Sequence, residues 1–139
     1  MNSSSIKSSK RTVVTAAVII KEGKILIARR DKNSSMGGLW EFPGGKVEFG
    51  ETDKDCLIRE IKEEMSIEIE IDSLFHIVPF SFKKKKYKLK AYTAIYKSGE
   101  IKLNAHDKIH WTEPNQLDLF AFSPADIPIK DKIQSLQDN

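Results

Sequence analysis

The sequence predicts a mixed α/β (α+β) fold, in which several short strands surround one central helix and a second helix follows near the C-terminus. Apolar runs rich in β-branched residues, bounded by glycine and polar turns, indicate the strands. A segment with apolar residues at three- and four-residue intervals indicates the central helix. No linker or internal repeat divides the 139 residues. We therefore expect one domain over residues 11–139, after a flexible Ser- and Lys-rich tail at 1–10.

The first half of the chain predicts a β-hairpin followed by loops. Val13–Ile20 is apolar and β-branched, and a turn at Glu22-Gly23 closes it. Lys24–Arg29 follows at the distance of a hairpin partner. The next predicted elements are a surface loop at 31–38, a short strand at 39–42 that ends at Pro43, and an irregular loop at 44–50.

The second half begins with the central helix. Thr52 is a suitable N-cap, Asp53 and Asp55 suit the first turn, and the pattern continues to about Met65. The single cysteine, Cys56, is expected to pack there as a small apolar residue. The remaining predictions are strands at 67–71, 75–82 and 87–96, a polar segment at 104–110, a short strand or turn from Trp111, and a weaker helical pattern over 124–136.

Composition narrows the class of protein. Hydrophobic residues make up 40% and charged residues 31%, as is ordinary for a globular protein. The net charge of +3 owes much to Lys83–Lys86, which we expect to be a solvated hairpin edge, so we expect no stable nucleic-acid binding. No apolar run is long enough for a membrane span, and residues 1–10 lack the apolar region of a signal peptide. A cytoplasmic monomer or homodimer is expected.

Three glutamates give the strongest indication of function. Glu60, Glu63 and Glu64 fall within roughly 100° of one another on a helix, beside an apolar stripe. Like charges at this spacing are mutually unfavourable, so their grouping requires a reason. Magnesium prefers hard oxygen ligands and is usually held by one or two carboxylates together with substrate phosphates. The acidic edge therefore predicts a divalent-cation site.

The spacing of these residues resembles the signature of the Nudix hydrolase family, Gly-x5-Glu-x7-Arg-Glu-U-x-Glu-Glu-x-Gly-U, where U is a bulky aliphatic residue. From Gly45, the chain matches every specified position up to Ile67 except the second glycine, which is Ser66. The resemblance implies an α/β/α sandwich with a mixed β-sheet, in which the signature forms a strand-loop-helix unit. It also implies a hydrolase that uses Mg²⁺, with Mn²⁺ as a possible substitute.

The resemblance also implies the roles of individual residues. Glu60, Glu63 and Glu64 match metal ligands, with Glu60 also matching a candidate for the base that activates water. Gly44 matches the residue whose carbonyl completes the metal site. Arg59 matches the residue that orients a glutamate, and Glu51 matches a supporting position, although stabilising the helix N-terminus explains Glu51 equally well.

Segments at 39–48 and 122–128 look like those of MutT-type enzymes, which include the 8-oxo-dGTP diphosphatases and the CTP pyrophosphohydrolases. This likeness implies substrate contacts by Arg30, Glu41, Phe42 and Asp126, with Asp126 reading the base. An ionised Asp126 accepts hydrogen bonds equally well from the cytosine amine or from the N1 and N2 hydrogens of guanine, so the base stays open. The expected reaction releases pyrophosphate and a monophosphate from a (deoxy)nucleoside triphosphate, as nucleotide-pool housekeeping.

The chain departs from the family pattern at one further position, and two other functions are possible. Relatives often carry Glu-His six residues before a tryptophan, and the glutamate can serve as a further ligand or base; this chain has Ala105 at the glutamate's place, followed by His106. Either Asp107 or Glu41 takes up part of the glutamate's role, or the helix acts alone. His106 itself is expected to be a structural or surface residue. The substrate is alternatively a dinucleotide polyphosphate or a nucleotide sugar. A non-catalytic binding module that holds RNA or a nucleotide through Lys83–Lys86 is the alternative from another class.

Overall fold

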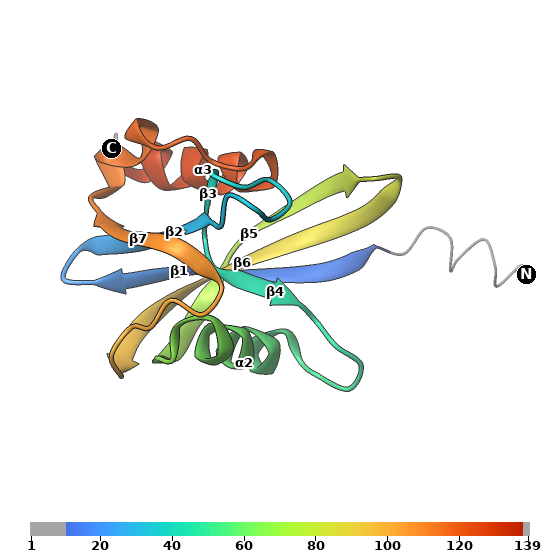
Figure 1. The fold of residues 1–139 in the computed structure, drawn as a ribbon, viewed down its shortest axis with the longest axis horizontal. Helices are drawn as coiled ribbons and strands as arrows, with labels where there is room; N and C mark the ends of the chain where they lie inside the picture. Colours follow the sequence, from blue (N-terminus) through green and yellow to red (C-terminus); the bar gives the residue numbers. More distant parts are fainter. Residues whose placement is uncertain (1–10, 138–139) are drawn as a thin grey trace, which may run out of the picture.

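The computed structural model describes residues 11–137, so the tail predicted at 1–10 lies outside the described residues. A seven-stranded mixed sheet forms the centre, with helices against both faces (Figure 1). The strands are β1 (Thr12–Lys21), β2 (Lys24–Arg30), β3 (Trp40–Glu41), β4 (Gly44–Lys46), β5 (Glu68–Phe82), β6 (Lys85–Ser98) and β7 (His106–Thr112). The helices are α2 (Asp53–Met65) and α3 (Ile127–Gln137), with 3-10 turns η1 (Pro114–Leu119) and η2 (Pro124–Asp126).

Strand β1 organises the sheet. It pairs in parallel with β6 along nine residues, and antiparallel with β2 and β4. Strand β7 pairs with the other edge of β2, and β5 pairs antiparallel with β6. The mixed sheet is thus as expected, because a long crossover through α2 and β5 brings β6 parallel to β1.

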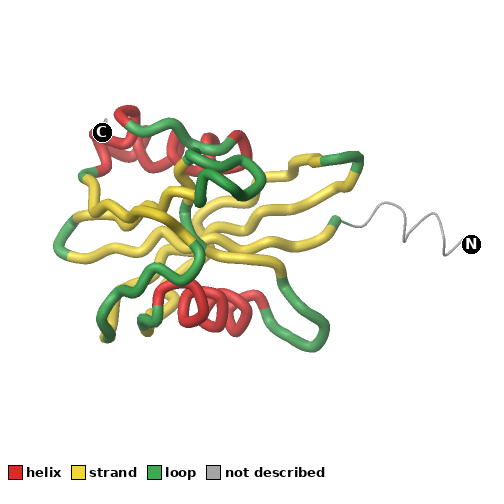
Figure 2. Tube along the Cα trace, in the orientation of Figure 1, coloured by secondary structure: helices red, strands yellow, loops and turns green. Residues whose placement is uncertain are grey.

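Two apolar cores lie on opposite faces of this sheet, as Figure 2 shows for the helices that cover them. Helix α2 buries Leu57, Ile61 and Met65 against one face. Helix α3 and the 3-10 turns cover the other face, where Ile129 and Ile133 are buried. This arrangement is the α/β/α sandwich that the resemblance to the Nudix family implies.

The ends of α2 follow local rules. Thr52 is the N-cap, and its hydroxyl accepts a hydrogen bond from the Asp55 amide at 3.1 Å. Ser66 takes the left-handed conformation expected of the family's glycine, with φ of 61°, and its amide donates to the Lys62 carbonyl. Cys56 is fully buried, as predicted.

The structure corrects three sequence predictions and adds one short element. The irregular loop expected from residue 44 begins instead with strand β4, which pairs with β1. The two strands expected at 67–71 and 75–82 form one continuous strand, β5. Strand β7 begins at His106, inside the segment predicted only to be polar, and not at Trp111. The 3-10 turn η1 is the added element. Strands β4 and β7 pair with β1 and β2, which are distant in sequence, and β5 stays continuous because it pairs along its length with its hairpin partner β6.

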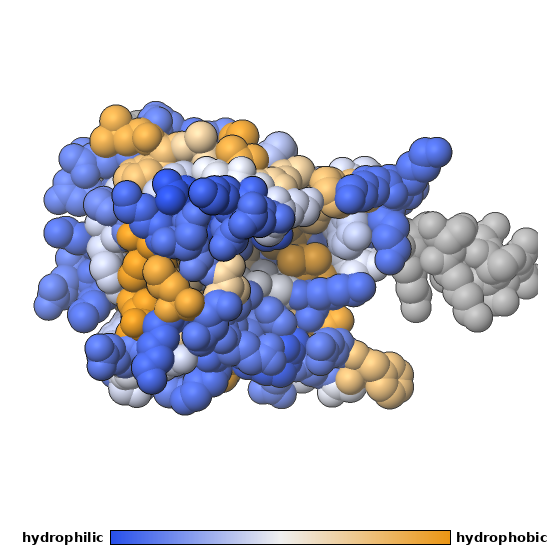
Figure 3. Space-filling model, viewed as in Figure 1, coloured by the Kyte–Doolittle hydropathy of each residue, from blue (hydrophilic) through white to orange (hydrophobic). Residues whose placement is uncertain are grey.

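Within residues 11–137, no helix is long and apolar enough to cross a membrane. Hydrophilic side chains cover most of the surface seen in Figure 3, and the loop between β4 and α2 projects from it. Phe49 in that loop is fully exposed.

Candidate active site

Two glycines bring strand β4 into contact with its neighbours. A Cβ at Gly44 would lie 2.0 Å from the carbonyl oxygen of Thr15 on β1, so only glycine fits this pairing. A Cβ at Gly45 would lie 2.1 Å from Oε2 of Glu60 on α2. The absent side chains thus let the backbone of β4 approach the carboxylate of Glu60 directly.

Arg59 binds three carboxylates at once. Its Nε and Nη2 donate to the two oxygens of Glu51 at 2.5 and 2.9 Å, a bidentate pair. Its Nη1 donates to Glu60 at 2.8 Å and to Glu63 at 2.9 Å. The hydrogen bond from Arg59, followed by one from the Glu48 amide, lowers the pKa of Glu51 to about 2. Arg59 therefore fixes Glu60 with its carboxyl group against Gly45, while Glu51 anchors the guanidinium.

The three helix glutamates differ in burial. Glu60 and Glu64 are mostly buried, whereas the Glu63 side chain is 57% exposed and turns toward Arg59. Oε1 of Glu64 is buried and has no hydrogen-bond partner. Burial, followed by the nearby carboxyls of Glu60 and Glu41, raises the pKa of Glu64 to about 9.

These observations fit a divalent cation. The donors are carboxylate oxygens, the ligand type that Mg²⁺ and Mn²⁺ prefer. A buried carboxyl oxygen without a partner is costly, and a cation between Glu60 and Glu64 would satisfy it and favour the ionised form. The chemistry and burial of these residues therefore suit the metal that the sequence predicts.

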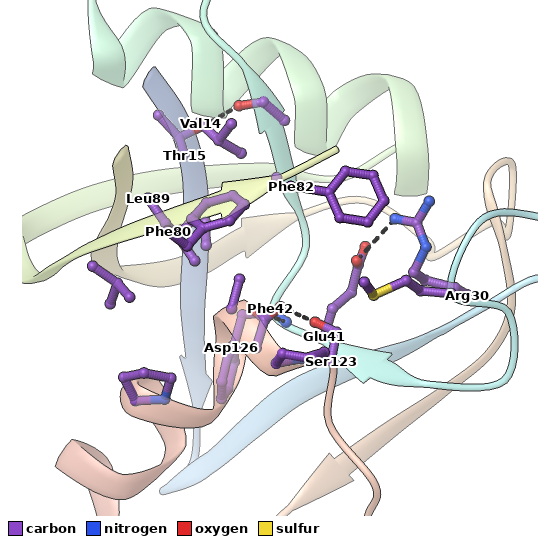
Figure 4. Close-up of a pocket in the computed structure, with 18 of the residues that line it drawn as sticks. Val14, Thr15, Arg30, Glu41, Phe42, Phe80, Phe82, Leu89, Ser123 and Asp126 are labelled. Atoms are coloured by element: carbon purple, nitrogen blue, oxygen red, sulfur yellow. Dashed lines mark hydrogen bonds and ion pairs between the residues drawn. The ribbon is translucent and has the colours of Figure 1, made fainter. Parts of the chain in front are cut away.

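A second group of side chains faces Glu64 from the sheet. Nε2 of His106 lies 2.8 Å from Oε2 of Glu41 and 4.0 Å from Oε1 of Glu64. Arg30 donates to the other oxygen of Glu41 at 3.1 Å, and Figure 4 shows these two side chains pointing toward each other. One ligand atom from each of Glu41, Glu64 and His106 lies within 4.8 Å of the other two.

A cavity of about 450 Å³ opens beside this group (Figure 4). Gly44 and Gly45 lie on its wall, which connects it to the Glu60 carboxylate. Aromatic and apolar residues form much of the remaining lining: Val14, Phe42, Val78, Phe80, Phe82, Leu89 and Ala125. The cavity has a volume and lining typical of sites for small molecules.

Asp126 is a buried residue in the lining of the cavity. One of its oxygens accepts from the Phe42 amide at 3.1 Å, and the other accepts from the Ser123 hydroxyl. Burial raises the pKa of Asp126 to about 7, although the hydrogen bond from Ser123 opposes this. Each oxygen keeps a lone pair beyond these contacts.

The structure distinguishes two pairs of residues between which the sequence did not decide: Arg29 and Arg30, and Asp107 and Glu41. Arg30 lines the cavity, whereas Arg29 donates to Asp107 at 2.8 Å. Asp107 is therefore paired with Arg29, and it is not part of the cluster with Glu64. Of the two residues proposed to replace a glutamate at position 105, Glu41 is the one close to Glu64. His106 follows Ala105 as the histidine follows the glutamate in relatives, but sequence reasoning treated it as a structural or surface residue. The structure shows its side chain buried beside Glu41, which no local pattern indicates.

Comparison with known proteins decides the family. The family model for the NUDIX domain matches residues 15–132. The chain belongs to the Nudix family. It is 33% identical over 128 residues to the CTP pyrophosphohydrolase of Escherichia coli, covering 92% of this chain and 95% of that protein. It is 30% identical over 128 residues to the 8-oxo-dGTP diphosphatase of the same organism, covering 91% of this chain and 99% of that protein.

Solved structures agree with this membership. The crystal structure of the MutT protein from Methanosarcina mazei Go1 superposes with a TM-score of 0.79 at 27% identity, covering 94% of this chain and 96% of that chain. The chain is therefore a MutT-like Nudix hydrolase, and the resemblance drawn from Gly45 to Ile67 is confirmed.

Proposed function

We propose that this Nudix hydrolase cleaves a (deoxy)nucleoside triphosphate to the monophosphate and pyrophosphate in a reaction that depends on Mg²⁺, with Mn²⁺ as a substitute. The observation that carries the proposal is a continuous path: the cavity holding Asp126 reaches Gly45, and Gly45 touches Glu60. A base bound in the cavity places its phosphates toward the carboxylates. The relatives named for CTP and 8-oxo-dGTP support nucleotide-pool housekeeping as its role, for which we propose a cytoplasmic setting.

In this proposal Glu60 is the base that takes a proton from the attacking water, and Arg59 holds its carboxylate in place. Glu60, Glu64 and the Gly44 carbonyl would hold the cation, with Glu63 at the exposed edge. A bound cation would neutralise charge on the phosphates and lower the pKa of the attacking water. Arg30, which lines the cavity and pairs with Glu41, would bind phosphate oxygens.

Substitution of the helix glutamates tests the reaction. We expect Glu60→Gln to lower pyrophosphate release from triphosphates by at least about 10²-fold, because an amide cannot accept the proton. Glu70→Gln is the matched control, since Glu70 is exposed and pairs with Lys97 away from the cavity. Release should be measured with Mg²⁺ for dCTP, dGTP and 8-oxo-dGTP, with circular dichroism to confirm folding. Equal activity in both variants, or none in the wild type, would contradict the proposal.

Asp126→Asn tests how the base is read. An asparagine retains one acceptor and adds a donor, so it pairs differently with cytosine and guanine. We expect the ratio of kcat/KM values for dCTP and 8-oxo-dGTP to change by about tenfold or more, because a mismatched buried polar group is costly. Ser35→Ala is a control at the rim of the cavity, where the Ser35 contact is made by its carbonyl and survives the change. An unchanged ratio in Asp126→Asn would show that Asp126 does not read the base.

A further inference from the structure

His106 is an almost wholly buried imidazole at the centre of the candidate active site. Its side chain is 3% exposed, and Nε2 lies 2.8 Å from Oε2 of Glu41. The register of β7 against β2 shifts here: His106 pairs with Arg30 and Lys108 with Arg29, so Asp107 is an extra residue. Bulges of this kind re-aim side chains next to functional sites. The fold thus places the imidazole beside Glu41 while Asp107 pairs with Arg29.

Glu41 is held from both sides. Arg30 donates to Oε1 and His106 approaches Oε2, so both carboxylate oxygens have a partner on the sheet. The Glu41 carboxylate lies close to that of Glu64, and two such groups repel each other unless a cation or a donor intervenes. Without the imidazole, nothing among the contacts of Glu41 in residues 11–137 would hold Oε2 near Glu64.

The imidazole is better placed to position Glu41 than to bind metal itself. A carboxylate only accepts hydrogen bonds, so the proton of the Glu41 contact sits on Nε2 of His106 and that nitrogen has no free lone pair. A histidine that binds metal through one nitrogen usually donates from the other to a carboxylate or carbonyl. Nδ1 of His106 is buried without a partner, which does not match that pattern.

We propose that His106 is a positioning residue: its Nε2–H holds the carboxylate of Glu41 beside Glu64, so that Glu41 joins the helix carboxylates as a ligand of the divalent cation. The proposal rests on the proposed function, because it assigns a residue to the same cation site. It identifies Glu41 as the residue that compensates for Ala105, and His106 as the reason Glu41 is available.

Three substitutions of His106 separate positioning from other roles. Leucine removes the donor at similar volume. Asparagine places an amide near the position of Nδ1, whereas glutamine reaches the position of Nε2. Mn²⁺ affinity, measured from the free-ion signal in electron paramagnetic resonance without nucleotide, gives a readout independent of turnover. We expect His106→Leu and His106→Asn to weaken Mn²⁺ binding by about tenfold or more, and His106→Gln to stay within about threefold of wild type. Glu41→Gln should match His106→Leu.

A spectroscopic measurement completes the test. In ¹⁵N-labelled protein, the Nε2 resonance of His106 should remain that of a protonated nitrogen when Mg²⁺ is added. A shift to a metal-bound nitrogen, or equal losses in His106→Gln and His106→Leu, would make His106 a ligand and overturn the proposal. Wild-type Mn²⁺ affinity in His106→Asn would also overturn it, even if the leucine variant does not fold. A wild type that neither binds Mn²⁺ nor releases pyrophosphate would instead refute the proposed function.

Discussion

The stability of the Asp126→Asn variant, compared with that of the wild type, is expected to increase as the pH rises. The folded-state pKa of Asp126 is raised from 3.8 to about 7, so the folded protein binds a proton that the unfolded chain has lost between these values. Its contribution to stability is therefore fully present below about pH 4 and disappears as the pH rises through 7. Asparagine has no such loss, because it does not ionise, and its amide still suits Phe42 and Ser123.

The magnitude follows from the size of the shift. At about 1.4 kcal/mol for each pKa unit, the interval from 3.8 to about 7 corresponds to about 4 kcal/mol. The free energy of unfolding of the variant, minus that of the wild type, should rise by about this amount between pH 4 and pH 8. Urea denaturation of both proteins at pH 4, 5.5, 7 and 8 measures it, and other titrating groups cancel in the difference. A difference independent of pH would refute the reasoning, since Asp126 would then be ionised in the folded protein throughout.

The glycines and the helix cap give further expectations. Gly44→Ala should lower the free energy of unfolding by about 2–3 kcal/mol in denaturant titrations, because its Cβ meets the backbone of Thr15. In Gly45→Ala, the added Cβ meets only the Glu60 side chain, which can move aside. We therefore expect the free energy of unfolding to change by less than about 1 kcal/mol, but pyrophosphate release to fall at least about tenfold because Glu60 is displaced. An equally active Gly45→Ala would show that the position of Glu60 is unimportant. Ser66→Gly should raise the melting temperature by about 3 °C, because glycine adopts the left-handed conformation at position 66 without strain. Ser66→Ala should give no such increase. Equal melting temperatures for the two variants in calorimetry would show that Ser66 is not strained.

What the sequence by itself determined is local. The cap at Thr52, the apolar stripe of α2 and the fixed spacing from Gly45 to Glu64 each depend on residues within a few turns of one another. Such patterns can be read from order along the chain, because helix periodicity and capping involve neighbours at three or four residues. They were sufficient to predict the fold class, the family and the acidic edge of the helix.

Only the tertiary structure decided which of those acids are buried and which residues join them. The contact between Glu41 and His106 spans 65 residues, and that between Phe42 and Asp126 spans 84. Strand pairing brings these residues together, and a bulge between β2 and β7 sets the register there. Burial then sets the charge of Glu64 and Asp126, since desolvation depends on neighbours from every element packed around a group. No local pattern contains that information, so the role proposed for His106 emerged only from the fold.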